Sequence, residues 1–324
     1  MPADELTNLT KERGVAKEEP SAPPSDGSPK HFGRSGGLVW VVVALVLCFS
    51  LPLFRLAQFA ANSKLYSYIL LVPFVSLYLL WLKRPSLQHD SEPVRRLAAL
   101  PLLAGLVVLV GYWAAVRSGS TLADDDYLAL TALSFVLFFF GACCLFLGKE
   151  RLRTAAFPMG FLVFIVPLPT FLSNWIEVFL QHGSAAVAYG LFSLSGTPVF
   201  WSGLNFQLPG FGLGVAPECS GIHSSLVLFL TSLLASHLFL RTTWKRAVLT
   251  LAVIPLALLR NGLRIFTIGQ LCLHIGPEMI RSSIHRRGGP LFFVLSLIPF
   301  FLLLMVLHKS DQARKKPEPN PLGA

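Results

Sequence analysis

Charged residues are scarce in this sequence. Only 14% of its 324 residues are Asp, Glu, Lys or Arg, whereas 53% are hydrophobic, and the mean hydropathy is +0.62. A soluble domain of ordinary composition carries about a quarter charged residues. The deficit excludes a soluble globular protein and predicts a polytopic membrane protein, in which one membrane domain takes up most of the chain.

Signatures of several common chemistries are also missing. The five cysteines are an odd number without a Cys-x-x-Cys pair, which argues against a disulfide framework or a zinc knuckle. The sequence has no His-Glu-x-x-His motif, Gly-rich phosphate loop, Gly-x-Ser-x-Gly elbow or pair of catalytic carboxylates. We therefore expect no cofactor and no metal. The net charge of +10 does not predict a nucleic-acid partner, because no basic face or aromatic-basic platform appears.

Eight apolar runs follow a polar N-terminal tail. Residues 1–36 are rich in Pro, Ser, Lys and Glu, and we predict a disordered cytoplasmic tail there. Each run is close to the ~20 residues that a helix needs to cross the hydrocarbon core, and a helix satisfies its own backbone groups. The fold class predicted is all-α, with a membrane domain over 37–308 and a basic cytoplasmic tail over 309–324. The expected spans are 38–54, 65–82, 98–116, 127–147, 155–172, 219–240, 247–271 and 290–308.

Basic loops set the orientation expected for these spans. Loops 83–97, 148–154 and 241–246 and the C-terminal tail are all rich in Lys and Arg. With eight spans in the cell membrane and both termini in the cytoplasm, all four segments face inward. Loop 274–289 then lies outside although it is also basic, which suggests that a function keeps the cluster there. This cluster consists of Arg281, Arg286 and Arg287.

The stretch before the sixth run is predicted to lie at the outer surface. Residues 174–196 are apolar enough for a ninth span, but Glu177, Gln181 and Ser184 recur at helical spacing and form one polar face. We favour a surface or re-entrant amphipathic helix, because a ninth span would turn loop 241–246 outside. Residues 197–216 alternate β-prone pieces with Ser-Gly and Pro-Gly, which predicts a small hairpin or meander.

Reactive side chains gather between that hairpin and the sixth run, in Pro217–Ser225. Cys219 lies at the expected start of a helix, where unpaired N–H groups and the helix dipole favour a thiolate. Judged by its residue type alone, it is equally well a structural thiol. His223 follows four residues later on the same helix face. The two could hold a metal together with His285 or His182, but no zinc signature accompanies them.

Two further residues can reach the same outer interface. Arg264 lies about 10 Å below the outer end of the seventh run, at 1.5 Å per residue. An arginine at this depth is costly and marks a candidate functional site, although it could also snorkel outward or pair with Glu177. Arg260, one turn deeper, is the more structural of the two. His285 lies in the loop before the eighth run, where it could also be an ordinary loop residue.

Taken in order, these motifs resemble the exosortase/archaeosortase family of membrane cysteine transpeptidases. The resemblance rests on Pro-Glu-Cys-Ser-Gly-Ile at 217–222, Asn-x-x-Arg-Ile at 261–265 and His-x-x-Gly at 285–288. It implies that Cys219 is the nucleophile, Arg264 the transition-state stabiliser and His285 the acid–base partner. The supporting residues are Asn261, Ser220, Gly221 and His223. Two positions depart from the family, since His223 is often Arg in bacterial relatives and Tyr68 is often His.

The resemblance also implies the substrates. They are membrane-anchored exported proteins with a C-terminal sorting signal, which is a short motif followed by one transmembrane helix and a basic cluster. The outer cluster around Arg286 would hold an acidic residue of that motif or a lipid headgroup. A transporter or channel with an intramembrane arginine anion site, and a non-catalytic scaffold, are the rival hypotheses. The joint presence of Cys219, Arg264 and His285 favours a cysteine-type endopeptidase and transpeptidase.

Overall fold

The computed structural model describes residues 32–84, 95–119, 123–217, 220–276, 278–279 and 289–313, with side chains from residue 36 onward. Most of these residues are helical, and three strands form one small sheet. This confirms the expected helical membrane class with a small β element. The helices are α1 (Phe32–Cys48), α2 (Ser50–Asn62), α3 (Val72–Leu82), α4 (Arg95–Arg117), α5 (Asp124–Phe146), α6 (Lys149–Phe161), α7 (Thr170–Leu194), α8 (Ile222–Phe239), α9 (Thr243–Leu251), α10 (Val253–His274) and α12 (Gly289–Ala313), with short 3₁₀ helices η1 (Ser67–Leu70) and η3 (Leu162–Ile165).

Within the described residues, five helical segments are long and apolar enough to cross a membrane. They are α4, α5, α8, α12 and the rod formed by α9 and α10, Thr243–His274. Two bent pairs, α1 with α2 and α6 with α7, raise the number to seven if each pair is one span, and Ser67–Leu82 is a shorter apolar helix. The chain is therefore a multi-pass membrane protein, whereas the count of eight spans stays a prediction.

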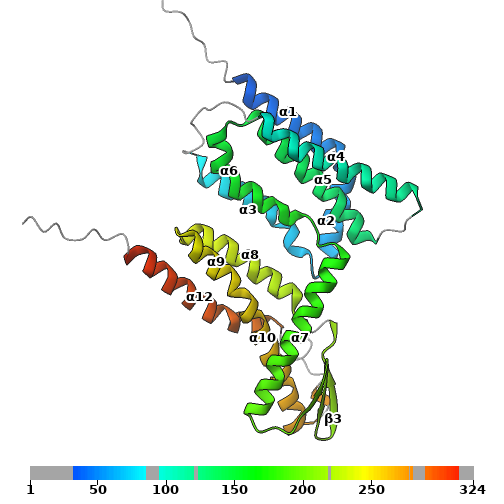
Figure 1. Cartoon of the computed structure of the whole chain (residues 1–324), viewed down its shortest axis with the longest axis vertical. Coiled ribbons are helices and arrows are strands. Elements are labelled where there is room, and N and C mark those ends of the chain that lie inside the picture. The colour runs from blue at the N-terminus through cyan, green and yellow to red at the C-terminus, as the bar shows by residue number, and fades with distance from the viewer. Residues whose placement is uncertain are drawn as a thin grey trace, which may run out of the picture.

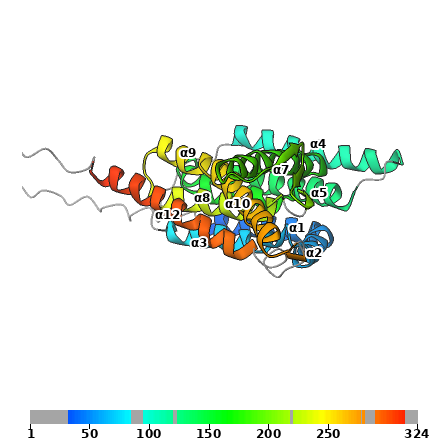
Figure 2. The ribbon, with the colours of Figure 1, turned by 90° about the horizontal axis from the view of Figure 1, so that it is seen from below.

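Most helices lie side by side in one bundle, and one corner of the molecule extends beyond it (Figure 1). That corner contains α7, the C-terminal part of α10 and the sheet. Figure 2, turned by 90°, shows α4 on one side of the assembly and α1, α2 and α3 on the other. The elements that follow Pro217 in sequence thus reach from the bundle into the extended corner.

Proline accounts for the sharp turn that leads into this corner. Segments Lys149–Ile165 and Thr170–Leu194 meet at 91°, and Pro167 and Pro169 lie between them. Proline has no N–H to donate and disfavours the helical conformation of the residue before it. The expected span over 155–172 is therefore interrupted: its helical part ends at Ile165, and the chain then turns into α7.

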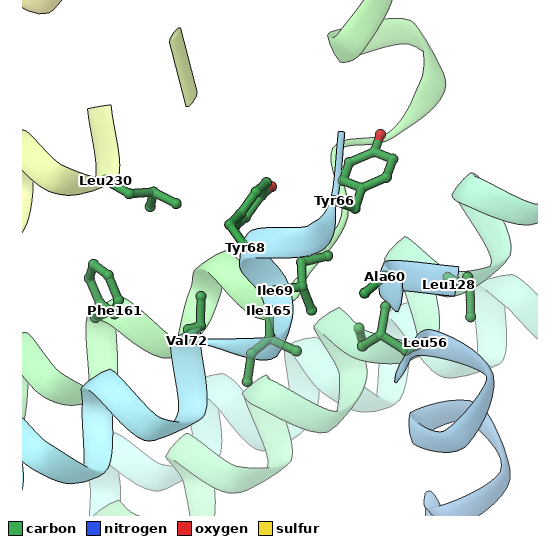
Figure 3. Close-up of a cluster of buried hydrophobic side chains, with 11 residues drawn as sticks. Leu56, Ala60, Tyr66, Tyr68, Ile69, Val72, Leu128, Phe161, Ile165 and Leu230 are labelled. Atoms are coloured by element: carbon green, nitrogen blue, oxygen red, sulfur yellow. The ribbon is translucent and has the colours of Figure 1, made fainter. Parts of the chain in front are cut away.

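A buried cluster fixes the N-terminal helices against this turn (Figure 3). Tyr68 and Val72 belong to it, together with Phe161 and Ile165 from the segment before the turn. The Tyr66 hydroxyl donates a hydrogen bond to the carbonyl oxygen of Leu168, at 3.2 Å. The remaining members of the cluster come from α2, η1, α5 and α8: Leu56, Ala60, Ile69, Leu128, Ala132 and Leu230.

The small sheet lies where the sequence predicts it. Strands β1 (Phe200–Ser202), β2 (Asn205–Leu208) and β3 (Phe211–Gly214) pair antiparallel in sequence order, so the expected meander is confirmed. Its buried side chains form one core with α7 and α10, in which Phe192, Phe206 and Ile265 take part. The two helices approach closely, because a Cβ atom on Gly262 would lie only 2.5 Å from Val187.

The predicted helix over 174–196 is present as part of α7, but its polar face is turned inward. Gln181 is 4% exposed and Ser184 is fully buried. A Cβ atom on Gly262 of α10 would lie 3.1 Å from the Ser184 carbonyl oxygen, so this face of α7 packs against α10. The helical spacing of these residues was correctly predicted, and the structure shows that the part of the face formed by Gln181 and Ser184 is buried.

Candidate functional site

The predicted site is only partly within the structure. Cys219 and His285 lie outside the described residues, and so does the basic cluster Arg281, Arg286 and Arg287. The described residues nearest to Cys219 in sequence are Pro217 and Ser220. The geometry of the site is therefore built from Ser220, Gly221 and His223 on one side and from α10 on the other.

Gly221 shapes the turn that precedes α8. Its φ of 72° and ψ of 16° are left-handed, a conformation that glycine adopts without steric cost. A Cβ atom here would also lie 2.9 Å from Nη2 of Arg260. The helix begins at Ile222, so Cys219 precedes its N-cap by two residues, and the expectation that the helix opens at 219 was wrong.

Hydroxyl groups complete the first turn of α8. Ser224 and Ser225 each donate a side-chain hydrogen bond to the Gly221 carbonyl oxygen, at 3.1 and 2.8 Å. Ser220 is 2% exposed, and its backbone N–H donates to the Pro217 carbonyl oxygen at 3.0 Å. The chain on both sides of Gly221 is thus held in one conformation by short local hydrogen bonds.

Two adjacent side chains of α10 donate hydrogen bonds to the turn before α8. Nη2 of Arg260 donates to the Gly221 carbonyl oxygen and to Oγ of Ser225, each at 3.1 Å. Nδ2 of Asn261 donates to the Ser220 carbonyl oxygen at 3.3 Å. Arg260 is 7% exposed and Asn261 3% exposed, so these bonds form away from solvent, where the loss of a partner is expensive. The sequence left the role of Asn261 open, and this contact assigns it a structural task.

A cavity of about 980 Å³ lies in front of the turn. Its lining includes Ser220, Gly221 and His223 from the turn and Arg264 from α10. Four of the predicted site residues therefore share one cavity. Asn261 is not part of the cavity lining. Pro217, Gly289 and Phe293 also line the cavity, so it reaches the chain next to Cys219 and the start of α12.

The opposite wall comes from a part of the chain that sequence reasoning did not connect with the site. Lys64 and Ser67, between α2 and α3, line the same cavity. They precede Ser220 by about 150 residues, and no local pattern joins segments so far apart. The sequence signal for this wall is the Tyr66-Ser67 pair, which is a further, supporting match to the family that the three motifs resemble.

The metal hypothesis gains no support from the described part of the chain. No three His, Cys, Asp or Glu side chains converge there to hold an ion. Nδ1 of His182 lies 2.9 Å from the Val178 carbonyl oxygen of its own helix, and its side chain is exposed on α7. His182 is therefore engaged locally, whereas His223 lines the cavity.

Comparison with known proteins gives one match. A family model described as transmembrane exosortase matches residues 60–302, well over half of the chain. No curated protein and no solved structure matches this chain. The matched range contains the turn before α8, the whole of α10 and the N-terminal wall of the cavity at Lys64 and Ser67.

Proposed function

This chain belongs to the transmembrane exosortase family, and we propose that it is a cysteine peptidase and transpeptidase that cleaves C-terminal sorting signals. Its substrates are exported proteins that carry a short motif, one transmembrane helix and a basic cluster. The observation that supports the proposal most is the shared cavity, which Arg264 lines together with Pro217 and Ser220 on either side of Cys219. A guanidinium that faces such a cavity can stabilise the oxyanion that develops when a nucleophilic thiol attacks a carbonyl group.

In the proposed reaction, the Cys219 thiolate attacks the scissile carbonyl carbon. The new C–S bond forms as the peptide C–N bond breaks, and the product is a thioester. His285 takes the thiol proton and passes it to the leaving amine. Arg264 donates hydrogen bonds to the oxyanion that develops in between. An incoming amine or water then attacks the thioester and releases the thiolate, which completes transfer or hydrolysis.

Arg260 and Asn261 are assigned a positioning role in this mechanism. Their hydrogen bonds hold the carbonyl groups of Gly221 and Ser220, which lie two residues and one residue beyond Cys219. A nucleophile must be held close to its attack geometry, because small displacements cost large factors in rate. His223 also lines the cavity and is a second candidate base for the thiol. His223→Gln is expected to retain processing if His285 is the base.

The proposed topology has eight spans, cytoplasmic termini and the site at the outer face of the cell membrane. Support comes from the basic loops that this topology places inside. The outer cluster Arg281, Arg286 and Arg287 would then bind an acidic motif residue or a lipid headgroup. A membrane-impermeant thiol reagent should label Cys219 from outside the cell. Labelling by permeant reagents alone would contradict this orientation.

The decisive experiment follows the processing of a co-expressed sorting-signal protein in membranes. Cys219→Ala should abolish processing, because no other side chain forms the thioester in place of Cys219. Cys48→Ala is the matched control, since Cys48 is an exposed thiol on α1, outside the cavity lining. Mass spectrometry of the wild-type protein should detect an acyl adduct on Cys219. Unimpaired processing by Cys219→Ala would exclude the nucleophile, and an anion transporter would tolerate this change.

A further inference from the structure

Three basic side chains from distant parts of the sequence come together at one end of the bundle. Lys83 directly follows α3, His237 lies in the last turn of α8, and Arg246 lies near the start of α9. The end of α3 and the junction of α8 and α9 lie on the same side of the molecule (Figure 1). Lys83 lies within electrostatic range of Arg246, and His237 lies within range of both. We call these three residues the Lys83 cluster.

Helix α6 joins Lys83 to His237. Nζ of Lys83 donates a hydrogen bond to the carbonyl oxygen of Thr154, at 3.5 Å. Three residues further along α6, the ring of Phe157 stacks on the ring of His237, with 3.6 Å between the centroids and 1° between the planes. Residues three apart share one face of a helix. The packing of α6 against α8 therefore brings Lys83 and His237 to the same place.

Arg246 is held next to them from the side of α8. Its Nε donates a hydrogen bond at 2.8 Å to the carbonyl oxygen of Leu240, the residue that ends α8. Leu240 follows His237 by three residues. A guanidinium group has five N–H donors, and this bond uses one of them. The other donors of Arg246 are available for a ligand.

The Lys83 cluster has no acidic partner within the part of the chain that the structure describes. Neither Lys83 nor Arg246 forms an ion pair there, and both are partly buried. Asp311 of α12 does reach the start of α9, but it pairs with Lys245 at 2.9 Å. Like charges that are held together in partly desolvated surroundings repel each other. An anion bound between Lys83 and Arg246 would offset this repulsion.

The position of the cluster indicates the kind of anion. The helix α8 and the rod of α9 and α10 are candidate spans, and the cluster lies where α8 ends and α9 begins. Trp81 and Trp244 precede Lys83 and Arg246 by two residues each, and they are 54% and 58% exposed. Tryptophan is enriched at the level of the lipid headgroups. Basic pockets between membrane helices bind the phosphate groups of anionic lipids.

We infer that the Lys83 cluster is a phosphate-binding site, which the headgroup of an anionic phospholipid or a free phosphate ion can occupy. Lys83 and Arg246 would donate charge-assisted hydrogen bonds to the phosphate oxygens, and the imidazole of His237 supplies a further N–H donor. The bound phosphate would join α3 and α6 to α8 and α9, and so stabilise the folded protein. This site is independent of the proposed peptidase activity.

The test measures the binding of phosphatidylglycerol to the full-length protein in a neutral detergent, by native mass spectrometry. The wild-type protein should retain phosphatidylglycerol in preference to phosphatidylcholine. Lys83→Gln/Arg246→Gln should weaken this binding about 25-fold, because each basic residue near a lipid phosphate contributes a factor of about five.

Arg55→Gln/Arg117→Gln is the matched control for this double variant. It removes the same charge from two exposed arginines, which lie over the rings of Tyr127 and Trp113 instead. Phosphatidylglycerol binding should persist in this control. Equal weakening in both double variants would overturn the site, because binding would then follow the total charge of the protein.

Thermal unfolding of the wild-type protein distinguishes the two sources of phosphate. A rise in unfolding temperature with phosphatidylglycerol, but not with inorganic phosphate at an ionic strength matched by chloride, identifies the lipid as the ligand. A rise with inorganic phosphate that phosphatidylglycerol does not increase further identifies free phosphate. Absence of a rise with either would overturn the proposal.

A single substitution covers the case in which the double variant does not fold. Lys83 donates one hydrogen bond, at 3.5 Å, so little of the fold depends on it. Lys83→Gln should weaken phosphatidylglycerol binding about fivefold, whereas Lys83→Arg, which keeps the charge, should retain it. Unchanged binding in Lys83→Gln would contradict the proposal. None of these measurements involves cleavage, so the phosphate site and the peptidase assignment can fail separately.

Discussion

Two buried cations on the same helical rod are accommodated in different ways. Lys245 of α9 is 4% exposed, and its Nζ lies 2.9 Å from a carboxylate oxygen of Asp311 and 3.0 Å from Oγ of Ser310. Arg260 of α10 is 7% exposed, but its described partners are a carbonyl oxygen and a hydroxyl group. Near the start of the rod the cation thus has an ion pair, whereas near its middle the described partners of Arg260 are neutral groups.

The difference indicates that Lys245 has a structural role, whereas Arg260 belongs to the surroundings of the proposed site. At Lys245 the opposite charge of Asp311 neutralises the site. The pair therefore leaves no net charge to attract a further ligand. At Arg260 the neighbouring charge has the same sign, because Arg264 lies within electrostatic range. Two cationic side chains, Arg264 and Lys64, line the cavity. A developing oxyanion is stabilised by such charges, more so where water is scarce.

The strongest test of this comparison is the removal of the cation that lines the cavity. Arg264→Ala should lower the rate of processing by about 10²–10³-fold, the usual cost of a lost oxyanion donor. The measurement is the rate of substrate cleavage in membranes at matched protein levels. Arg264→Lys should recover only part of it, because an ammonium group lacks the planar pair of donors.

Arg260 provides the contrast within the same helix. Arg260→Leu removes the hydrogen bonds that its guanidinium donates to the Gly221 carbonyl oxygen and to the Ser225 hydroxyl, and a hydrogen bond with a charged partner contributes about 1.5–3 kcal/mol. We therefore expect a clear fall in unfolding temperature in detergent, together with slower processing. If Arg260→Leu left both properties unchanged, the positioning role of Arg260 would be excluded.

Gly221→Ala is expected to have a smaller effect, and Gly196→Ala serves as its internal control. Gly221→Ala places a side chain on a residue with φ of 72° and brings it within 2.9 Å of Arg260. Gly196→Ala meets the same backbone strain, at φ of 71°, but nothing lies within 4 Å of its Cβ position. The shared strain costs about 1–2 kcal/mol. Thermal unfolding of both should show a greater loss at Gly221, and only that variant should slow processing. Equal losses would mean that contact with Arg260 is unimportant.

Local features of the fold were predictable, because local sequence encodes them. Apolar length predicts helices, and the Gly and Pro punctuation of 197–216 predicts the three strands. Spacing also identified the polar face of Gln181 and Ser184. It could not say which way that face turns, because periodicity is the same whether the outside is water or lipid. The cavity wall at Lys64 could not be predicted at all, since it depends on tertiary packing across about 150 residues.

The ion-paired end of the rod should respond to mutation in stability alone. Asp311 accepts hydrogen bonds from the backbone N–H and the hydroxyl of Thr242 as well as pairing with Lys245. Asp311→Asn removes the opposite charge and should lower the unfolding temperature, while processing per folded molecule stays unchanged. The double variant Lys245→Met/Asp311→Leu should be more stable than Asp311→Asn, because no buried charge is left unpaired. A processing defect in the folded Asp311→Asn protein would show that the ion pair of Lys245 is coupled to the site around Arg260.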